Sequence, residues 1–412
     1  MAASFDGSPE RTGDDDASGV RRIDRIEAIE RRLRVAFVCD TFRAGVPSGG
    51  VVAARRLVEG LRRRHDVVVV SADADGPDCV RMPAFQIPIR AMRDQGFVMA
   101  WPRRDLLARL FATVDVVHLQ FPFWLSFAAL DEAHRAGRPV IAGFHVQPEN
   151  GFLSVGIDWP WLCRRVYRFW VSRLFDRADV VLCPSEFAAH KLRAHGLRAP
   201  TVVVSNGVPL DAREHVAARP RLHDGEFVIM IVGRLAAEKR QEVLIRAVQR
   251  SRYRERIRLV VAGQGPREKL LARLAAPLGP ARARIGYLPR EELLDELAGA
   301  DLLVHCSDVE LEGLAVLEAM SLGVPVLVAD SPESAASRLV AGDDFRFPAG
   351  DVEALTARID ALLDHPALLL RAGKDGLELA RSLDFGQSVD RIAQLYHCAI
   401  DRGCSPKRLT SP

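Results

Sequence analysis

The sequence lacks paired cysteines and any long apolar run. Its seven cysteines form no CxxC motif and no paired spacing, which argues against a zinc site and against a disulfide framework. No apolar stretch approaches the roughly 18 residues that a membrane span needs, and the acidic, polar N-terminus does not have the pattern of a signal peptide. We therefore expect a cytoplasmic protein.

The chain also has little lysine and almost no net charge. Five of its 57 basic residues are lysines, and the formal net charge is +3, so nothing favours a nucleic-acid partner. The charge is unevenly distributed: residues 1–31 carry −3, residues 32–205 carry +8 and residues 206–412 carry −2. An arginine excess in 32–205 can meet an anionic surface, although solvated arginine on helix faces is the commoner explanation.

The composition predicts a folded chain of two domains. With 412 residues, 48% of them hydrophobic and 27% charged, each half is large enough to bury its own core. Residues 1–31 are expected to be an acidic, disordered tail with a short lead-in helix. A strand that ends in turn residues near 205–209 predicts domains over 32–205 and 206–384, followed by a helix and a frayed end over 385–412.

Short β-branched apolar runs alternate with helix-period stretches, which is typical of βαβ units around parallel sheets. The runs are nearly continuous, as strands covered on both faces require. The predicted strands are Arg34–Cys39, Asp66–Ser71, Val114–Leu119, Pro139–Phe144, Val180–Cys183, Thr201–Val204, Phe227–Val232, Arg258–Ala262, Ala283–Ile285, Leu302–His305 and Pro325–Val328. They predict an α/β fold with two doubly wound parallel sheets and a ligand cleft at the carboxyl ends of the strands.

Two short motifs near predicted strand ends suit phosphate binding. Gly49 and Gly50 precede a helical stretch, where free backbone N–H groups can approach an anion. Arg234 and Lys239 lie just past the strand Phe227–Val232, where a planar guanidinium and an ammonium can bracket a diphosphate. Taken alone, each motif is equally well explained as a structural turn or a solvated helix start.

The segment 301–330 is the most specific one. A strand ends at His305, a loop carries Glu310 and Glu312, and Gly313 opens a helix that contains Glu318. A helix start at Gly313 and Leu314 favours phosphate oxygens, and carboxylates on either side of it can accept hydrogen bonds from sugar hydroxyls.

This segment resembles the E-x7-E signature of retaining GT-B glycosyltransferases of family four, with Glu310 and Glu318 at the glutamate positions. Residues 33–400 follow the order of that family: Gly49-Gly50, Gly233-Arg234 to Lys239, Gly263 to Pro266, Gly286 to Pro289, then the two glutamates. Positions 311, 312 and 315 depart from the usual E-G-F-G-L-P pattern. The resemblance implies two Rossmann-like domains facing a cleft, with the nucleotide-sugar donor bound mainly by the second.

The resemblance also assigns roles to residues. Arg234 and Lys239 would hold the diphosphate, Glu318 the ribose and Glu310 the sugar hydroxyls, while backbone near Tyr287 and Leu288 would meet the base. Gly49, Gly50, Gly313 and Leu314 complete the donor site. It implies no metal and no cofactor besides the nucleotide sugar.

His145 is a further candidate for catalysis. It follows the strand Pro139–Phe144, at a carboxyl end, and it matches a histidine of the family's first domain. A lone histidine is often structural, but this position favours contact with the transferred sugar or the acceptor.

Two stretches, 118–150 and 330–351, resemble bacterial 1,2-diacylglycerol glucosyltransferases, which suggests UDP-glucose as donor and a lipid such as diacylglycerol as acceptor. Residues 81–104 and 160–176 mix aromatic and basic side chains that can lie on an anionic membrane, as a peripheral protein of its inner face. On a helical wheel, Leu162, Val166, Phe169 and Trp170 share one side, and packing of that side into the core explains the pattern equally well.

Several alternatives stay open at this point. The donor can be GDP-mannose or another UDP-sugar, and the acceptor a glycan, a polyprenyl-linked sugar or a small cyclitol. A nucleotide-sugar 2-epimerase shares the same architecture, as does a binding module without activity. The sequence does not fix the oligomeric state. The resemblance further implies that a helix over 385–400 crosses back to the first domain.

Overall fold

The computed structural model describes residues 31–46, 48–85, 97–210 and 225–401. Residues 33–412 belong to one compact unit, and Met1–Arg32 is a separate one. The predicted acidic tail and lead-in helix therefore lie almost entirely outside the described residues, as does the frayed C-terminal end beyond residue 401.

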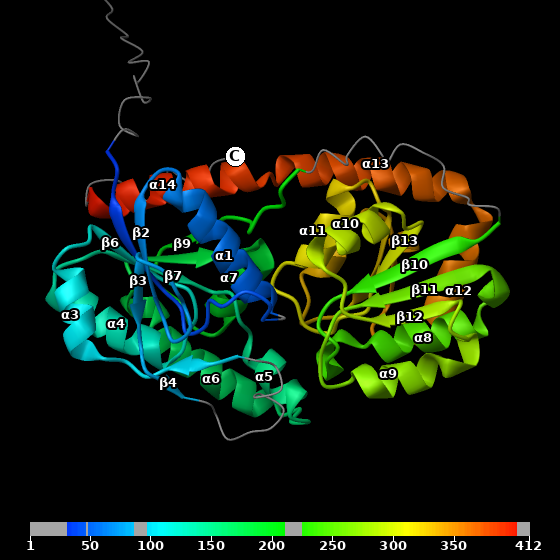
Figure 1. Ribbon diagram of the computed structural model, residues 1–412, viewed down its shortest axis with the longest axis horizontal. Helices are drawn as coiled ribbons and strands as arrows, with labels where there is room; N and C mark the ends of the chain where they lie inside the picture. Colours follow the sequence, from blue (N-terminus) through cyan, green and yellow to red (C-terminus); the bar gives the residue numbers. More distant parts are fainter. Residues whose placement is uncertain (1–30, 47, 86–96, 211–224, 402–412) are drawn as a thin grey trace, which may run out of the picture. The chain divides into compact units, whose positions relative to one another are not determined.

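The first half of the unit is built on a parallel sheet, which has seven strands in the described residues (Figure 1). Its order is β3-β2-β1-β6-β7-β8-β9, and every neighbouring pair is parallel. The strands are β1 (Arg34–Val38), β2 (Asp66–Ser71), β3 (Cys79–Arg81), β6 (Val116–Leu119), β7 (Val140–Gly143), β8 (Val180–Cys183) and β9 (Thr201–Val203). A short antiparallel pair, β4 (Ala84–Phe85) with β5 (Met99–Ala100), lies apart from it.

Along β1, neighbouring side chains belong to cores on opposite faces of this sheet. Val35 and Phe37 pack in one core with residues of α1 (Gly49–Arg62) and α14 (Phe385–Ile400). Ala36 and Val38 pack in another core with residues of α3 (Arg104–Phe111), α4 (Trp124–Arg135) and α6 (Pro160–Arg173). Successive side chains of a strand point to opposite faces, so a strand covered on both sides must be apolar throughout. This explains why the continuous apolar runs predicted these strands.

The second half is built on a six-stranded parallel sheet, again counting described residues only. Its order is β12-β11-β10-β13-β14-β15. The strands are β10 (Phe227–Val232), β11 (Ile257–Ala262), β12 (Ala283–Gly286), β13 (Leu302–His305), β14 (Val326–Asp330) and β15 (Arg346–Pro348). The predicted architecture of two doubly wound α/β sheets is therefore confirmed.

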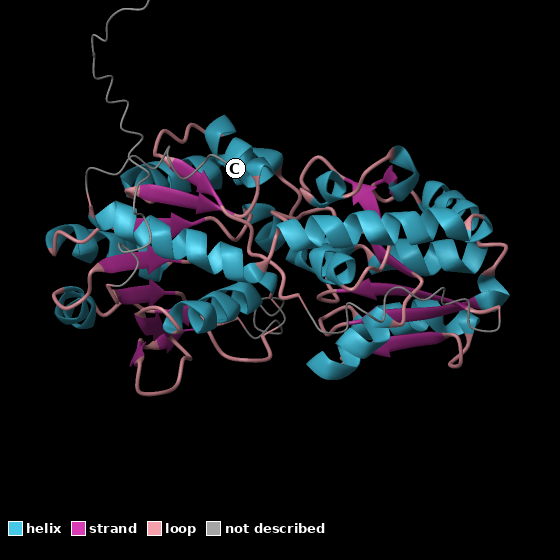
Figure 2. Ribbon diagram, turned by 90° about the horizontal axis from the view of Figure 1, so that it is seen from above, coloured by secondary structure: helices cyan, strands magenta, loops and turns pink. Residues whose placement is uncertain are grey.

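Helices cover both faces of the sheets (Figures 1 and 2). They are α1 (Gly49–Arg62), α3 (Arg104–Phe111), α4 (Trp124–Arg135), α5 (Pro148–Ser154), α6 (Pro160–Arg173), α7 (Glu186–Ala194), α8 (Gln241–Arg250), α9 (Glu268–Ala275), α10 (Arg290–Ala298), α11 (Leu314–Ser321), α12 (Val352–Asp364), α13 (Pro366–Ser382) and α14 (Phe385–Ile400). Within the described ranges, none of them combines the length and the apolar character required to cross a lipid bilayer.

The last helix, α14, packs on the first sheet although it follows the second one in sequence (Figure 1). Val389, Ile392 and Tyr396 are buried there in the same core as Val35 and Phe37 of β1. The Tyr396 hydroxyl is 2.8 Å from Nδ1 of His118, a buried residue of β6. The helix thus lies over the first sheet, as the resemblance implied.

The structure corrects three details of the sequence reading. Gly49 and Gly50 are the first residues of α1 rather than a turn before it. The wheel of α6 gave the wrong core face, because its buried residues are Cys163, Tyr167, Trp170 and Val171, while Phe169 remains half exposed.

The third correction concerns the cysteines. Cys398 on α14 is disulfide-bonded, which the cysteine spacing did not predict. The other described cysteines are free.

Candidate functional site

A cavity of about 910 Å³ opens where the carboxyl ends of both sheets meet loops and helix starts. Its lining comes mainly from the segments that follow β1, β6, β7, β10, β11, β12 and β13. All of the predicted site residues line it: Gly49, Gly50, His145, Arg234, Lys239, Tyr287, Leu288, Glu310, Gly313, Leu314 and Glu318. The structure therefore brings together residues that are up to 269 positions apart, and their individual roles stay predictions.

Two helices begin at this cavity. A Cβ built on Gly49, the first residue of α1, would lie 3.7 Å from Leu314, the first residue of α11. Gly313 caps α11 in the left-handed region at φ 109°, a conformation that favours glycine. Both helix starts carry free backbone N–H groups and the positive end of a helix dipole, so this part of the cavity favours an anion.

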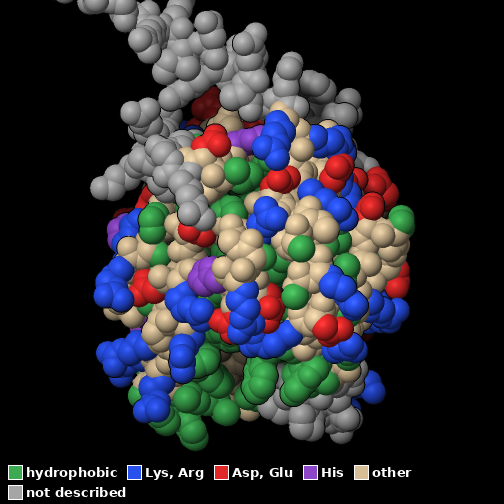
Figure 3. Space-filling view, turned by 90° about the vertical axis from the view of Figure 1, so that its left-hand side faces the viewer, with side chains coloured by type: hydrophobic (Ala, Val, Ile, Leu, Met, Phe, Trp, Pro, Cys, Tyr) green, Lys and Arg blue, Asp and Glu red, His purple; other side chains and the backbone are tan. Residues whose placement is uncertain are grey.

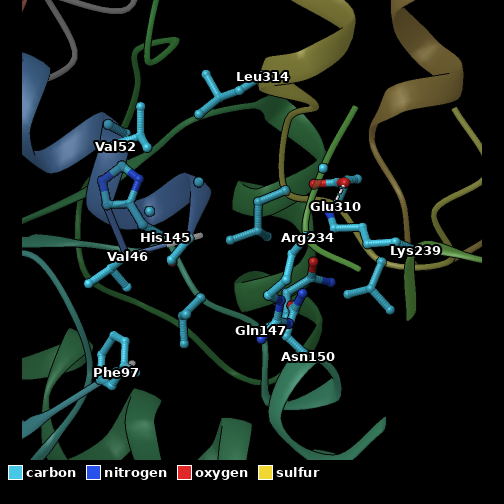
Figure 4. Close-up of a pocket in the computed structure, with 18 of the residues that line it drawn as sticks. Val46, Val52, Phe97, His145, Gln147, Asn150, Arg234, Lys239, Glu310 and Leu314 are labelled. Atoms are coloured by element: carbon cyan, nitrogen blue, oxygen red, sulfur yellow. Dashed lines mark hydrogen bonds and ion pairs between the residues drawn. The ribbon is translucent and has the colours of Figure 1, made fainter. Parts of the chain in front are cut away.

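Glu310 is held by two cationic or polar neighbours. Its carboxylate pairs with the Lys239 ammonium, and His305 Nε2 lies 3.1 Å from the same oxygen (Figure 4). Burial raises the pKa of Glu310, but the Lys239 charge and the hydrogen bonds from His305 and Lys239 outweigh it and leave that pKa well below its ordinary value. Glu310 is therefore an anion that accepts hydrogen bonds, and it is not a proton donor.

Arg234 follows β10 and reaches the cavity centre (Figure 4). Its guanidinium pairs with Glu238, whose side chain is fully buried in the short turn Ala237–Lys239. The neighbouring Gln241 donates to the Arg234 carbonyl at 2.7 Å. Glu238 thus holds the guanidinium, and Arg234 and Lys239 both line the cavity, where two cations suit a diphosphate.

Glu318, one turn inside α11, contacts arginines that the sequence reading did not single out. Arg56 of α1 lies 2.5 Å from its carboxylate, and Arg290, the first residue of α10, lies 3.0 Å away. Burial raises the pKa of Glu318, but the Arg56 and Arg290 charges hold it below its ordinary value. Solvated arginines are common on helices, so no sequence signal marked these two.

Glu312 was noticed in the sequence but was given no role. It is 6% exposed, and its carboxylate accepts hydrogen bonds from the Ser205 hydroxyl and from the backbone and side-chain amides of Asn206. Those residues form the connection between the two predicted domains. Burial raises the pKa of Glu312 to about 7, and the hydrogen bonds only partly oppose this.

His145 stands at the cavity wall behind Gly50. Both of its ring nitrogens are buried and make no hydrogen bond within the described part of the chain. Burial lowers the pKa of His145 to about 4, so the ring is neutral near pH 7. A Cβ on Gly143 would lie 2.7 Å from this ring, which explains why the strand before it ends in glycine.

The remainder of the cavity is mostly apolar. Figure 4 shows Val46, Val52 and Phe97 on the His145 side, opposite Glu310, Lys239 and Arg234. The rings of Phe97, Phe121 and Phe123 contact one another edge to face or tilted, at centroid distances of 5.6–6.0 Å. We call this region the apolar chamber; it is lined by Val46, Phe97, Phe123, Phe152, Val166 and Phe169.

Exposed aromatic side chains lie next to the apolar chamber. Trp101 stacks on Trp124 at 6.2 Å, and Trp159 stacks on Trp161 at 6.0 Å. Each of these four tryptophans, and Phe169, is at least half exposed. Figure 3 shows hydrophobic side chains gathered along the edge that carries β4, α4 and α6 in Figure 1, with Lys and Arg above them.

Among the described residues, no three His, Cys, Asp or Glu side chains gather where they could share a metal ion. The prediction that no metal takes part stays a prediction.

Comparison with known families matches both halves of the chain. Residues 47–212 match the model described as Glycosyltransferase Family 4, and residues 213–378 match the one described as Glycosyl transferases group 1.

Curated relatives point the same way. A GDP-mannose-dependent alpha-mannosyltransferase of Mycolicibacterium smegmatis is 31% identical over 73% of this chain and 80% of its own. An alpha-monoglucosyldiacylglycerol synthase of Streptococcus pneumoniae is 24% identical over 73% of this chain and 72% of its own.

Among solved structures, HepE of Anabaena in complex with UDP-glucose superimposes with a TM-score of 0.68. It is 19% identical and covers 88% of this chain and 99% of its own. At this identity the similarity shows the shared fold.

Proposed function

Because the chain belongs to the GT-B glycosyltransferases of family four, we propose that it is a retaining hexosyltransferase that acts on a lipid hydroxyl. Transfer of a sugar from a nucleotide sugar to an acceptor is the activity of that family. The observation that carries the proposal is a single cavity with two unlike parts. One part holds Arg234, Lys239, Glu310 and the start of α11, and the other is the apolar chamber.

The donor binds in the charged part of the cavity. Arg234, Lys239 and the N–H groups at the start of α11 hold the diphosphate. When Lys239 turns to the phosphates, Glu310 becomes available to accept hydrogen bonds from sugar hydroxyls. Glu318 accepts hydrogen bonds from the ribose, and the base lies against the backbone of Tyr287 and Leu288.

Catalysis consists of positioning and of stabilising the leaving group. The acceptor oxygen forms a bond with the anomeric carbon on the face from which the diphosphate departs, so the anomeric configuration is retained. The acceptor proton passes to the departing phosphate oxygen, whose charge Arg234 and Lys239 stabilise. Neutral His145 contacts the transferred sugar or the acceptor by hydrogen bonding.

Arg234 and Lys239 stabilise the diphosphate charge, as a divalent ion does in other transferases. We therefore propose that the reaction needs no metal. Transfer should then persist in excess chelator, and its loss there would refute this part of the proposal.

The donor sugar divides the proposal into two candidates. UDP-glucose with a diacylglycerol acceptor follows the similarity to the monoglucosyldiacylglycerol synthase. GDP-mannose is favoured by the mannosyltransferase relative, which is 31% identical. A thermal-shift and hydrolysis screen over nucleotide sugars distinguishes them, because a bound donor stabilises the folded protein by an amount that grows with the logarithm of its concentration over Kd.

Glu310→Gln tests the assignment of the site. The amide keeps the shape but donates toward Lys239 and loses the anion that accepts from sugar hydroxyls. We expect transfer to fall by at least 100-fold while the thermal unfolding temperature stays within a few degrees of wild type. Glu353→Gln, an exposed glutamate of α12, is the matched control and should keep full activity. Full activity of Glu310→Gln would overturn the assignment.

We further propose that the protein works as a peripheral protein at the inner face of a membrane. The exposed tryptophans and Phe169 insert into the interface, and exposed Arg164, Arg165 and Arg168 of α6 meet anionic headgroups.

Co-sedimentation with liposomes tests this attachment. The protein should pellet with anionic vesicles at low salt and be partly released at high salt, because exposed charges are screened. Trp159→Ala with Trp161→Ala should weaken the binding. A protein that stays in the supernatant with anionic vesicles at low salt does not dock in this way.

A further inference from the structure

Among the described residues, the wall of the cavity that comes from the first half of the chain is almost free of charge. Of its described lining residues between positions 33 and 205, Arg56 alone has a permanently charged side chain, and Glu318 pairs with it at 2.5 Å. The other charged lining residues lie between positions 234 and 318. The apolar chamber therefore has no cation of its own among the described residues.

The lack of a cation limits which acceptor substrates can bind in the apolar chamber. A phosphate placed among Phe97, Phe123 and Val166 would lose its hydration without gaining a cation, which is unfavourable. Arg234 and Lys239 are not available to it when the donor diphosphate is bound.

One polar group in this wall has an unused hydrogen-bonding atom. Gln147 is 2% exposed, and its amide nitrogen donates to the Glu333 carbonyl at 3.2 Å. Because a carbonyl can only accept, the nitrogen of this amide faces Glu333, and the residue itself lines the cavity. The amide oxygen is buried and makes no hydrogen bond within the described residues. A buried acceptor without a donor is costly, so it marks a place where a ligand hydroxyl can donate.

Resting on the proposed glycosyltransferase activity, we propose that the acceptor is an uncharged lipid alcohol, with its hydroxyl donating to Gln147 Oε1 and its apolar part in the apolar chamber. Lipids with a phosphate beside the reacting hydroxyl are excluded. Gln147 lies beside Asn150, and both line the same cavity as Arg234 (Figure 4), so a hydroxyl held there shares the cavity with the donor.

A matched pair of acceptors tests the proposal. Diacylglycerol and phosphatidylglycerol with the same acyl chains both end in a primary hydroxyl, and phosphatidylglycerol adds a phosphate. Each is presented at the same mole fraction in phosphatidylcholine vesicles, with UDP-glucose and with GDP-mannose. We expect kcat/KM for diacylglycerol to exceed that for phosphatidylglycerol by at least 100-fold. Equal or faster transfer to phosphatidylglycerol overturns the proposal.

Hydrolysis of the donor without any lipid separates this proposal from the one on which it rests. If donor is hydrolysed but neither lipid is glycosylated, the acceptor assignment is wrong and the donor site stands. If no nucleotide sugar is bound or hydrolysed, the proposed function itself fails, and this inference fails with it.

Gln147→Leu tests the hydroxyl contact. Loss of one hydrogen bond should raise KM for diacylglycerol about three- to tenfold while the Kd for the nucleotide sugar stays unchanged. Gln249→Leu is the matched control, because Gln249 also donates to a backbone carbonyl, that of Leu274, but lies on α8 away from the cavity. An unchanged KM for Gln147→Leu, or an equal rise in Gln249→Leu, refutes the role of Gln147.

Discussion

The carboxylates that line the cavity are satisfied by three different kinds of neighbour. Glu310 pairs with a lysine, Glu318 with two arginines, and Glu312 with uncharged donors. This difference fixes their protonation. The pKa of Glu310 and of Glu318 lies below the ordinary value, whereas the pKa of Glu312 is raised to about 7. Glu312 is therefore the one of the three that titrates near neutral pH.

Glu312 makes the stability of the folded chain depend on pH. Because its pKa rises from 4.5 in the unfolded chain to about 7, the folded state binds this proton more tightly. The contribution of Glu312 to the unfolding free energy is thus fully present below about pH 4.5, and it is lost as the pH rises through 7, by up to about 3 kcal/mol.

The measurement compares wild type with Glu312→Gln by urea unfolding at half-unit steps from pH 4.5 to 8.5. The difference in unfolding free energy, wild type minus variant, should fall over this range and level off above pH 8. Groups common to both chains cancel in that difference. Parallel curves would mean that Glu312 does not titrate as its burial requires.

Among single residues, the sequence predicted those that belong to a recognisable motif. Glycines, Arg234, Lys239, Glu310 and Glu318 follow predicted strands or open predicted helices, so topology alone sends them to one edge. Arg56, Arg290 and Gln147 could not be found, because their importance depends on which partner lies opposite, and a single arginine or glutamine on a helix or loop carries no such information.

Among the elements, α11 begins at a glycine in a left-handed backbone conformation. Gly313 sits at φ 109°, and a Cβ there would lie 3.3 Å from that of Ala336. The turn directs the first N–H groups of α11 into the cavity, so its geometry matters for the donor as well as for stability.

Gly313→Ala should therefore lose both stability and donor affinity. The strained φ costs about 1–2 kcal/mol of unfolding free energy, and the displaced helix start should weaken nucleoside diphosphate binding at least tenfold in calorimetric titration. Gly342→Ala is the control, because Gly342 has φ 80° but open space around its Cβ position. It should lose similar stability and keep its affinity; equal affinity in both variants would contradict the role of this turn.

Long, doubly buried strands and the predicted last helix Phe385–Ile400 matched the structure closely, since an unbroken apolar run or a helical period extends over the whole element. The strands β3, β4, β5 and β15 were missed because two or three residues show no period. The α6 face was misread for another reason. A helix beside an apolar chamber has two apolar faces, one toward the core and one toward the cavity, and a wheel cannot tell them apart.

In the whole molecule, the contact between α1 and α14 joins the two ends of the described chain. Gly60 allows it, since a Cβ there would lie 2.6 Å from Val389 and 3.1 Å from Phe385. The absence of a side chain at one position of α1 therefore sets how closely the last helix approaches the first sheet.

Gly60→Ala should separate these helices and lower the unfolding free energy by about 1–3 kcal/mol through overpacking. Gly151→Ala, in α5 with nothing near its Cβ position, gives the same gain in helix propensity without a clash. It should be neutral or stabilising by up to about 1 kcal/mol. Denaturant unfolding of both variants checks this, and a stabilised Gly60→Ala would show that the helices can adjust freely.

Because α14 packs on the first sheet, it also determines how the chain behaves when it is produced as two separate fragments. A polypeptide that ends at residue 205 would leave the surface for Val389, Ile392 and Tyr396 bare, and the Tyr396 partner His118 would face water. Such a fragment should aggregate when it is produced alone and become soluble when the 206–412 piece is co-expressed with it. The two pieces would then reassemble as a split enzyme, held together by a helix that belongs by sequence to one piece and by packing to the other.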